Sequence, residues 1–432
     1  MTQKKAFAFT AGALFFLAGA APGAEDDAPA RARRVLAAHP VIDGHNDLPW
    51  AIRENASHPR DVEAYDLRAR TEGATDLGRL REGGVGGQFW SVYIPGELPG
   101  GFARMQLEQI DIARRMIARY PDRLAFATTV DEVERAMRGG RVASLLGIEG
   151  GQAIEDSLGA LRAYYDLGAR SMALTHQKTL DWVDAAGDAP RHGGLTRFGE
   201  EVVREMNRLG MLVDLSHVSD ETMEDALRVS EAPVIFSHSS ARALCDHPRN
   251  VPDAVLAKMK ANGGVVMVTF VNAFVSPAWA KASALLWKEE EDRTRGVADP
   301  TERERIRHGI RARLPKTPVP LALVADHVDH VRKVAGVDHV GLGGDYDGNT
   351  AWPEGLSDVS GYPRLLAELA RRGWSDEDLG KLASGNILRV MRRAEDVARR
   401  LQRERPASTA TMCHSEGAGG TSPEESAAGC LP

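Results

Sequence analysis

The sequence predicts an α/β fold, a single (β/α)8 barrel of the TIM type, on two observations. Short apolar runs alternate with stretches of helical periodicity, and we count eight such runs between residues 35 and 404. Most of the runs are continuously apolar, which is typical of parallel strands buried on both faces. An open, doubly wound sheet is the alternative. The predicted strands are Val41–His45, Val85–Ile94, Val142–Glu149, Ser171–His176, Leu212–His217, Pro233–His238, Gly264–Phe270 and His339–Asp345.

The stretches between these strands have the spacing of amphipathic helices. One of them precedes a C-capping Gly210 and repeats apolar residues every three or four positions, at Phe198, Val202, Met206 and Leu209. Residues 375–404 also read as helix, with a break at Gly385. A long insertion, residues 275–320, separates the last two predicted strands. A lid, a dimer contact and a solvated helix all fit its charged, helical pattern.

Composition bounds the class of protein. The chain has 432 residues, of which 43% are hydrophobic and 27% are charged, as in soluble globular proteins. The formal net charge is −7, and the sequence has no stripe of Lys and Arg interleaved with aromatic residues. Nucleic acid is therefore not expected as a partner.

The N-terminus has the pattern of a secretory signal peptide. Lys4 and Lys5 precede the apolar run 6–21, and Ala18-Gly19-Ala20 fits a cleavage site, so residues 1–21 are expected to be removed by a cut at about residues 20–24. A membrane anchor is the alternative, but the run is shorter than the roughly 20 residues of a spanning helix. The sequence thus predicts a soluble, exported protein, periplasmic or extracellular.

The C-terminus and the three cysteines carry less information. Residues 406–432 are rich in Ser, Thr, Gly, Glu and Ala without apolar periodicity, so we expect them to be disordered. Cys413 and Cys430 lie in this tail, where they can pair with each other or with another chain. Cys245 lies inside the barrel region, and no cysteine belongs to a CxxC zinc motif.

Metal-ligand side chains occur where predicted strands end. Six of the eight strands end in or next to His, Asp or Glu, at Asp43-Gly44-His45-Asn46-Asp47, Glu149, His176, His217, His238 and Asp345-Tyr346-Asp347. Each residue alone has an ordinary explanation as a turn former, a helix cap or a hydrogen-bonded histidine. Such ordinary explanations do not account for six of these residues on one face of the barrel. The carboxyl ends of barrel strands converge on the active-site face, where a shared function explains all six.

This set of side chains predicts a metal centre. Imidazoles and carboxylates without thiolates suit zinc or a similar divalent ion in a hydrolytic site. His45, Asp47, Glu149, His217 and His238 are too many ligands for one catalytic zinc with an open position, but they fit two ions that share a carboxylate. Glu149, on a strand between the others, is the natural bridge.

At these residues the chain resembles the membrane dipeptidase (renal dipeptidase) family of zinc peptidases, from about residue 35 to 400. The matching motifs occur in order and with compatible spacing. They are Asp43-Gly44-His45-Asn46-Asp47-Leu48-Pro49, Gly147-Ile148-Glu149-Gly150, Asp214-Leu215-Ser216-His217-Val218-Ser219, Phe236-Ser237-His238-Ser239-Ser240-Ala241, Arg249-Asn250-Val251-Pro252, Gly343-Gly344-Asp345-Tyr346-Asp347-Gly348 and Gly385-Asn386.

The resemblance implies two zinc ions. His45 and Asp47 would bind one ion, His217 and His238 the other, and Glu149 would bridge them. A hydroxide held between the ions would attack the peptide bond of a dipeptide, because zinc lowers the pKa of a bound water.

The resemblance also implies roles around the metals. Asp345 would accept the water proton and return it to the leaving amine. His176 would contact the substrate near the scissile carbonyl and its oxyanion. Arg249 would pair with the free carboxylate of the dipeptide, to which a guanidinium is matched in shape and charge. Asp43 is expected to orient a ligand, and Asp347 to cap a following helix.

Departures from the family leave its finer properties open here. The family forms homodimers, accepts a D-residue at the C-terminal position, and in some members opens β-lactams. Cys245 falls where animal members have a disulfide cysteine, but no matching partner is found, so it is expected to be free. The lipid-anchor signal of the animal proteins is absent, and the 275–320 insertion is longer.

Two rival functions stay possible at this stage. The first is another two-metal barrel hydrolase, such as an N-acyl-amino-acid deacylase, a lactonase or a phosphotriesterase. Related barrels bridge their metals with a carboxylated lysine, whereas here Glu149 takes that place and Lys178 lies beyond the strand end. The second is a non-catalytic metal-binding barrel, against which stands the complete set of ligands together with Asp345.

Overall fold

The computed structural model describes residues 26–98, 100–297, 299–412 and 430–431. The predicted signal peptide, residues 1–21, lies outside these ranges, as does Cys413 with its predicted pairing. Within the described ranges, no helix is long and apolar enough to cross a membrane. Cys245 is buried and free, as expected.

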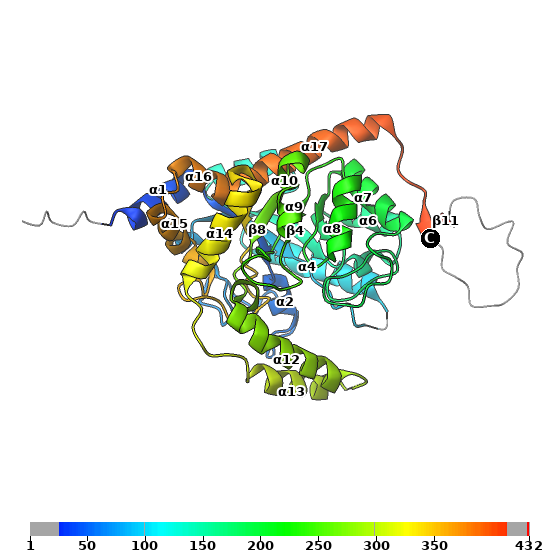
Figure 1. Cartoon of the computed structure of the whole chain (residues 1–432), viewed down its shortest axis with the longest axis horizontal. Helices are drawn as coiled ribbons and strands as arrows, with labels where there is room; N and C mark the ends of the chain where they lie inside the picture. Colours follow the sequence, from blue (N-terminus) through cyan, green and yellow to red (C-terminus); the bar gives the residue numbers. More distant parts are fainter. Residues whose placement is uncertain (1–25, 99, 298, 413–429, 432) are drawn as a thin grey trace, which may run out of the picture.

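Eight parallel strands close into a barrel with helices around it, which confirms the predicted fold and excludes the open sheet (Figure 1). The ring closes because the second strand pairs with both the first and the fourth, while the first strand also pairs with the ninth. The strands are β1 Val41–Asn46, β2 Val85–Ser91, β3 Leu124–Phe126, β4 Val142–Glu149, β5 Ala169–Ala173, β6 Leu212–Asp214, β7 Ile235–Phe236, β8 Val265–Val268 and β9 Val340–Leu342.

The short strand β3 was not predicted. It lies outside the ring and pairs with the first three residues of β4, Val142 to Ser144, while β5 pairs with the later residues of β4 from Leu146 onward. With only three residues, two of them partly exposed, β3 has no apolar run for the sequence to reveal.

Helices surround the barrel on the outside. They are α1 Ala28–Ala38, α2 Leu48–Arg53, α3 Leu77–Glu82, α4 Phe102–Arg119, α5 Val130–Arg138, η1 Gly151–Ile154, α6 Leu158–Asp166, α7 Arg197–Leu209, α8 Asp220–Val229, α9 Asp253–Leu256, α10 Met259–Asn262, α11 Asn272–Val275, α12 Pro277–Thr294, α13 Pro300–Arg311, α14 Leu321–Ala335, η2 Val337–His339, η3 Val359–Gly361, α15 Tyr362–Arg371, α16 Asp376–Gly380, η4 Lys381–Gly385 and α17 Asn386–Glu404.

The helix end predicted at Gly210 and the break predicted at Gly385 are both present. Thr196 caps the N-terminus of α7 by accepting the amide hydrogen of Gly199, and Gly210 ends it with φ 87°. The predicted break at Gly385 is a π-helical turn, η4, between α16 and α17. Such a turn inserts one residue into the helical ladder and redirects the helix.

The interior of the barrel changes character along the strands. Buried side chains from the strand beginnings, including Ile42, Leu145 and Met267, form one cluster with the apolar face of α17. Further along the strands, the inward positions hold small or polar residues such as Ser91, Gly147 and Ser237. The α17 end is thus apolar and closed, and the other end has room for polar side chains.

The insertion 275–320 contains a helical hairpin. Helices α12 and α13 project from the barrel in Figure 1 and pack against each other through Leu286, Ile306 and Ile310. The hairpin leaves the barrel directly after α11, on the side of the strand carboxyl ends.

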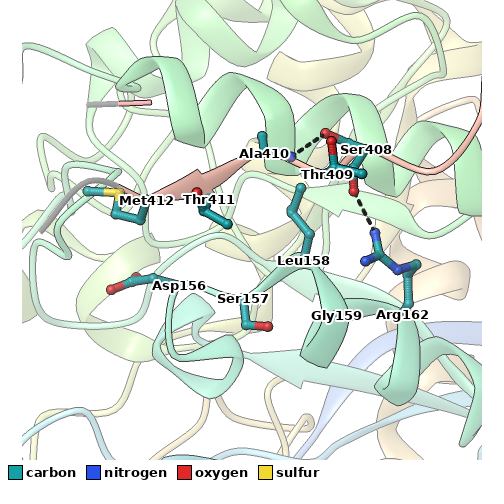
Figure 2. Close-up of a pocket in the computed structure, with 10 residues that line it drawn as sticks. All are labelled: Asp156, Ser157, Leu158, Gly159, Arg162, Ser408, Thr409, Ala410, Thr411 and Met412. Carbon is teal, nitrogen blue, oxygen red and sulfur yellow. Dashed lines mark hydrogen bonds between the residues drawn. The ribbon is translucent and has the colours of Figure 1, made fainter. Parts of the chain in front are cut away.

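The described start of the C-terminal tail packs beside α6, while the disorder expected for residues 406–432 stays a prediction. Residues 406–412 run past the start of α6, where Arg162 donates to the carbonyl oxygen of Ser408 (3.1 Å), and Ser408 donates to Glu201 (3.0 Å). A cavity of about 320 Å³ lies between the tail and α6 (Figure 2). The strand β10 Thr411–Met412 pairs with β11 Cys430–Leu431.

A buried histidine ties α14 to the loops at the carboxyl end of the barrel. His327 Nδ1 accepts the amide hydrogen of Ala241 (3.0 Å), and Nε2 donates to the carbonyl oxygen of Val275 (3.2 Å). Burial lowers the pKa of His327 to about 4, despite the opposing hydrogen bond to Val275. The neutral ring therefore holds together the loop after β7 and the start of the hairpin.

We predict that His327 makes the fold less stable as pH falls. Its folded pKa, about 4, lies below the ordinary value of 6.5, so its contribution is complete above pH 6.5 and is lost as pH falls toward 4. Between pH 7 and pH 5 this loss is about 2 kcal/mol. Urea unfolding at both pH values should show the wild type losing about that much more stability than His327→Gln. Equal losses in the two proteins would contradict this account.

Candidate metal centre and substrate site

The predicted ligands meet at the carboxyl end of the barrel although they come from four different strands. His45 and Asp47 lie at the end of β1 and just after it, and Glu149 is the last residue of β4. His217 and His238 follow β6 and β7. All five residues are at most 6% exposed, so the cluster lies inside the barrel mouth rather than on its rim.

Glu149 lies between two groups of ligands. Its Oε2 is 3.3 Å from His45 Nε2, which is itself 3.1 Å from Asp47 Oδ2. Its Oε1 is 3.0 Å from His217 Nε2 and 3.5 Å from His238 Nε2. The two oxygens of one carboxylate thus face different sets of ligands.

The cluster has the donor atoms of a cation site. Three overlapping groups have ligand atoms within 4.8 Å of one another: His45, Glu149 and His238; Glu149, His176 and His217; His45, Asp47 and Asp345. The Nε2 atoms of His217 and His238 are only 2.9 Å apart, which suits two imidazoles directed at a common cation. Within the part of the chain that the structure describes, the buried Asp47 Oδ1 has no hydrogen-bond partner.

Neighbouring side chains fix the orientation of two ligands. Ser237 Oγ lies 2.8 Å from His238 Nδ1 and also donates to Asp214, so Nε2 of His238 is left facing the cluster. Ser91 donates to Glu149 Oε2 (3.0 Å). Such contacts set ring tautomer and carboxylate orientation in metal sites.

Several site residues have strained backbone. His217 (φ 75°), Asp345 (φ 57°) and Asp347 (φ 64°) adopt the left-handed conformation that residues other than glycine seldom take. The predicted strands ran on through His217 and Asp345, whereas β6 ends at Asp214 and β9 at Leu342. Strain of this kind costs of order 1–3 kcal/mol at each residue and persists where function requires the orientation.

The imidazoles of the cluster differ in protonation preference: His217 and His238 favour the neutral form and His45 the charged form. Burial lowers the pKa of His217 and His238 well below the ordinary value, with Arg249 adding to both effects. Burial also lowers the pKa of His45, but the charges of Glu149 and Asp47 outweigh it and raise the net value well above normal. The side of the cluster beside Asp47 therefore attracts positive charge, as a metal site must.

Asp345 lies beside this cluster and has a different protonation preference. Burial, together with the nearby charges of Asp47 and Glu149, raises the pKa of Asp345 well above the ordinary value, although His45 and Arg249 oppose the shift. The carboxyl is 9% exposed and belongs to the group formed with His45 and Asp47. It is thus a buried carboxyl able to take up a proton next to the ligands.

His176 forms one wall of the site. Its ring centre lies 4.3 Å from that of His217, and its Nε2 lies 3.7 Å from Glu149 Oε1. Tyr93 packs on the other side of His176, with ring centres 4.8 Å apart. Tyr93 was not among the residues predicted for the site, although it is the last residue but one of the predicted strand Val85–Ile94.

Arg249 forms another wall. It is 5% exposed and makes two long hydrogen bonds, to Ser239 Oγ (3.4 Å) and to the carbonyl oxygen of His238 (3.3 Å). Its buried Nε has no partner among the described residues. Burial lowers the pKa of Arg249 to about 10, while Asp345 and Glu149 act to raise it. A guanidinium so placed has donors to spare for an anion.

The two aspartates set apart in the sequence analysis differ in role. Asp43 Oδ1 accepts the amide hydrogens of His45 (2.8 Å) and Gly344 (3.1 Å), so it orients the backbone that carries a ligand. Asp347 was expected to cap a following helix, and this was wrong. In the described structure no helix begins directly after Asp347, and its Oδ1 accepts the amide hydrogen of Ala74 (2.6 Å).

The chain matches a known family over most of its length. The model of the membrane dipeptidase family (peptidase family M19) matches residues 29–405. The chain belongs to this family. As a dipeptidase it hydrolyses peptide bonds, and the family is one of metallopeptidases, in line with the buried His, Asp and Glu clusters of the site.

Solved structures agree with this membership. The dipeptidase is 25% identical to the probable dipeptidase PvdM from Pseudomonas aeruginosa (TM-score 0.73, covering 86% of this chain and 99% of that one). It is 26% identical to a metallopeptidase from Rhodobacter sphaeroides bound to a phosphinate mimic of L-Ala-D-Ala (TM-score 0.69, 82% and 99%). It is 28% identical to another dipeptidase of the same family (TM-score 0.68, 82% and 98%).

We predict that Gly348→Ala weakens metal binding by this dipeptidase. A methyl group at Gly348 would lie 2.2 Å from Asp47 Oδ2 and 2.6 Å from Asp345 Oδ1, so both carboxylates would have to move. Displaced ligand geometry should lower metal affinity by about 10- to 100-fold, measured by competition with a chelator. Gly309→Ala on α13 is the matched control, because a methyl group there meets nothing within 4 Å. Wild-type affinity in a folded Gly348→Ala protein would refute the assignment.

Proposed function

We propose that the enzyme hydrolyses dipeptides with two zinc ions, held by His45, Asp47, Glu149, His217 and His238. The position of Glu149 carries the proposal, because one oxygen faces His45 and the other faces His217 and His238. When bound, the ions would supply an activated water and polarise the scissile carbonyl. Two observations support this occupancy: the imidazoles of His217 and His238 favour the neutral form, and the charges of Glu149 and Asp47 attract a cation to the side of His45.

Arg249 binds the carboxylate of the dipeptide in this proposal. Its guanidinium is buried, with an unpartnered Nε among the described residues and two long hydrogen bonds. An incoming carboxylate would replace those weak contacts with charge-assisted ones. A peptide with one more residue at its C-terminus would place a neutral amide, instead of the carboxylate, beside Arg249. This contact therefore limits the substrate to two residues.

In this proposal His176 stabilises the oxyanion, and Asp345 transfers the proton. The His176 ring lies beside Glu149, so a donated hydrogen bond from it can stabilise the oxygen that gains charge as the carbonyl becomes tetrahedral. Asp345 accepts the proton of the attacking water and returns it to the leaving amine, a role suited to a buried carboxyl whose pKa is raised by burial and by Asp47 and Glu149. Glu149 holds the two ligand groups in register throughout.

The rival two-metal hydrolases fit less well. Lys178, the lysine available to a carboxylated bridge, has its Nζ 4.0 Å from Asp188 Oδ1, and Glu149 already faces both groups of ligands. A neutral lactone or phosphotriester also has no carboxylate for Arg249. A non-catalytic barrel would have no use for Asp345 beside an intact cluster.

We also infer that dipeptides with a C-terminal D-residue are substrates and that the enzyme is exported as a soluble homodimer. The Rhodobacter sphaeroides relative, 26% identical, binds a phosphinate mimic of L-Ala-D-Ala. The pattern of residues 1–21 supports export, and the family resemblance supports a dimer. Intact mass and light scattering of the exported protein check both, and a monomer that retains residues 1–21 would contradict them.

The first experiment measures amino-acid release from L,L- and L,D-dipeptides by enzyme stripped of metal and then reloaded. Cleavage should disappear on stripping and return with zinc, and it should fail for N-blocked dipeptides and for tripeptides. Protein shown to hold two zinc ions per chain but inactive on every dipeptide would refute the proposal and turn attention to deacylase and lactone substrates.

We predict that Asp345→Asn keeps its zinc but loses turnover. An amide cannot accept and return the proton, and loss of such a group lowers kcat by about 10²- to 10⁴-fold. Steady-state kinetics and metal analysis on the same preparation separate the two effects. Asp338→Asn is the matched control, because Asp338 lies in η2, just before β9 begins, and pairs with Lys381. Wild-type turnover in Asp345→Asn would exclude the proton-transfer role.

A further inference from the structure

A line of aromatic side chains connects the α12–α13 hairpin to Arg249. Trp287 of α12 meets the ring of His247 edge-on, with centres 5.7 Å apart and planes at 85°. His247 packs on Phe274 of α11, with centres 4.5 Å apart. The Arg249 guanidinium carbon lies 5.3 Å from the centre of the Phe274 ring. We refer to Trp287, His247 and Phe274 as the aromatic column.

The aromatic column supplies a large share of what orients Arg249. The two side-chain hydrogen bonds of Arg249 are 3.3 and 3.4 Å long, too long to fix a guanidinium firmly. Phe274 presents its ring face to the guanidinium, and His247 Nδ1 accepts the amide hydrogen of Arg249 (3.2 Å). Side chain and backbone of Arg249 therefore both rest on the column.

The end of the column formed by Phe274 is anchored in the barrel. Asn250 Nδ2 donates to the carbonyl oxygens of Phe274 (2.7 Å) and Cys245 (2.8 Å), which joins the loop of Arg249 to α11. Burial lowers the pKa of His247 to about 3, with Arg249 and Arg242 adding to the effect, so its ring is neutral beside the guanidinium. The ring therefore stacks without repelling Arg249.

The other end of the column, Trp287, belongs to the hairpin. The core of the hairpin is formed by Leu286, Ile306 and Ile310, and Trp287 is not part of it. Trp287 is 39% exposed, and the ring it contacts is that of His247. A large aromatic residue placed at the surface against a loop of the barrel has a use outside the hairpin itself.

The hairpin also acts electrostatically on the side of the site formed by Tyr93 and His176. Tyr93, which packs on His176, feels the positive charge of Arg307 on α13, although burial and the charges of Glu97 and Glu149 dominate and raise its pKa.

We propose that Trp287 is a positioning residue: through His247 and Phe274 it holds the Arg249 guanidinium in place for the substrate carboxylate. This inference rests on the proposed function, since it takes Arg249 as the group that reads the carboxylate. Trp287 touches neither the ligands nor the reacting atoms, so its effect should fall on substrate binding rather than on the chemical step.

The test compares KM and kcat for a dipeptide in Trp287→Ala, Trp287→Phe and Leu285→Ala. Loss of this support loosens the guanidinium on the Phe274 ring, so Trp287→Ala should raise KM about 3- to 10-fold, with kcat nearly unchanged. Trp287→Phe should restore most of the loss. Leu285→Ala is the control, because Leu285 lies two residues away on the same helix and is 74% exposed.

A second pair of variants shows whether the effect passes through Arg249. In an Arg249→Met background, adding Trp287→Ala should leave KM unchanged, because the guanidinium to be positioned is gone. Phe274→Leu should raise KM at least as much as Trp287→Ala does. An unchanged KM in Trp287→Ala, or an equal rise with and without Arg249, would overturn the inference while dipeptide cleavage by the wild type left the proposed function intact. No cleavage by the metal-loaded wild type would overturn both.

Discussion

The carboxylate of Glu149 is buried in the barrel mouth, where it faces imidazoles that come from three other strands. An isolated carboxylate there would cost several kcal/mol in lost hydration. His45, His217 and Ser91 offset that cost. Burial by itself raises the pKa of Glu149, but the charge of His45 and the hydrogen bonds from His217 and His45 outweigh it and leave the pKa well below the ordinary value. The remaining features of the site follow from this anion, since each ligand lies where it can share a cation with Glu149.

The barrel makes this arrangement possible through the size of its interior residues. The apolar layer that α17 covers, with Ile42 and Leu145, supplies the hydrophobic burial. Beyond it, close approaches need small residues: a methyl group on Gly343 would lie 1.8 Å from the carbonyl oxygen of Ser237. The strands can therefore bring their carboxyl ends close enough for His238 and Glu149 to meet at 3.5 Å.

The substrate side of the site depends on loops and on the hairpin rather than on the strands. Arg249 is placed by the loop after β7, which His327 and Asn250 tie to α14 and α11. The aromatic column continues this support to α12. Metal ligands on strand ends and substrate contacts on loops divide the work, so the insertion can vary without disturbing the cluster.

The sequence by itself determined the barrel and the residue types at its active end. Apolar runs alternating with helical periodicity require parallel strands covered by helices, and His45, Glu149, His217 and His238 each appear where such a strand runs out. The tertiary structure decided the features that hydrophobic periodicity and motif spacing do not predict. The strand β3 is too short to have a pattern, and the strand ends at His217 and Asp345 depend on left-handed backbone that only the packed loops impose. Asp347 reaches across to Ala74, and Trp287 to His247, over distances in the chain that no local signal spans. Local patterns report which face of an element is buried, whereas contacts between distant segments arise only when the whole barrel closes.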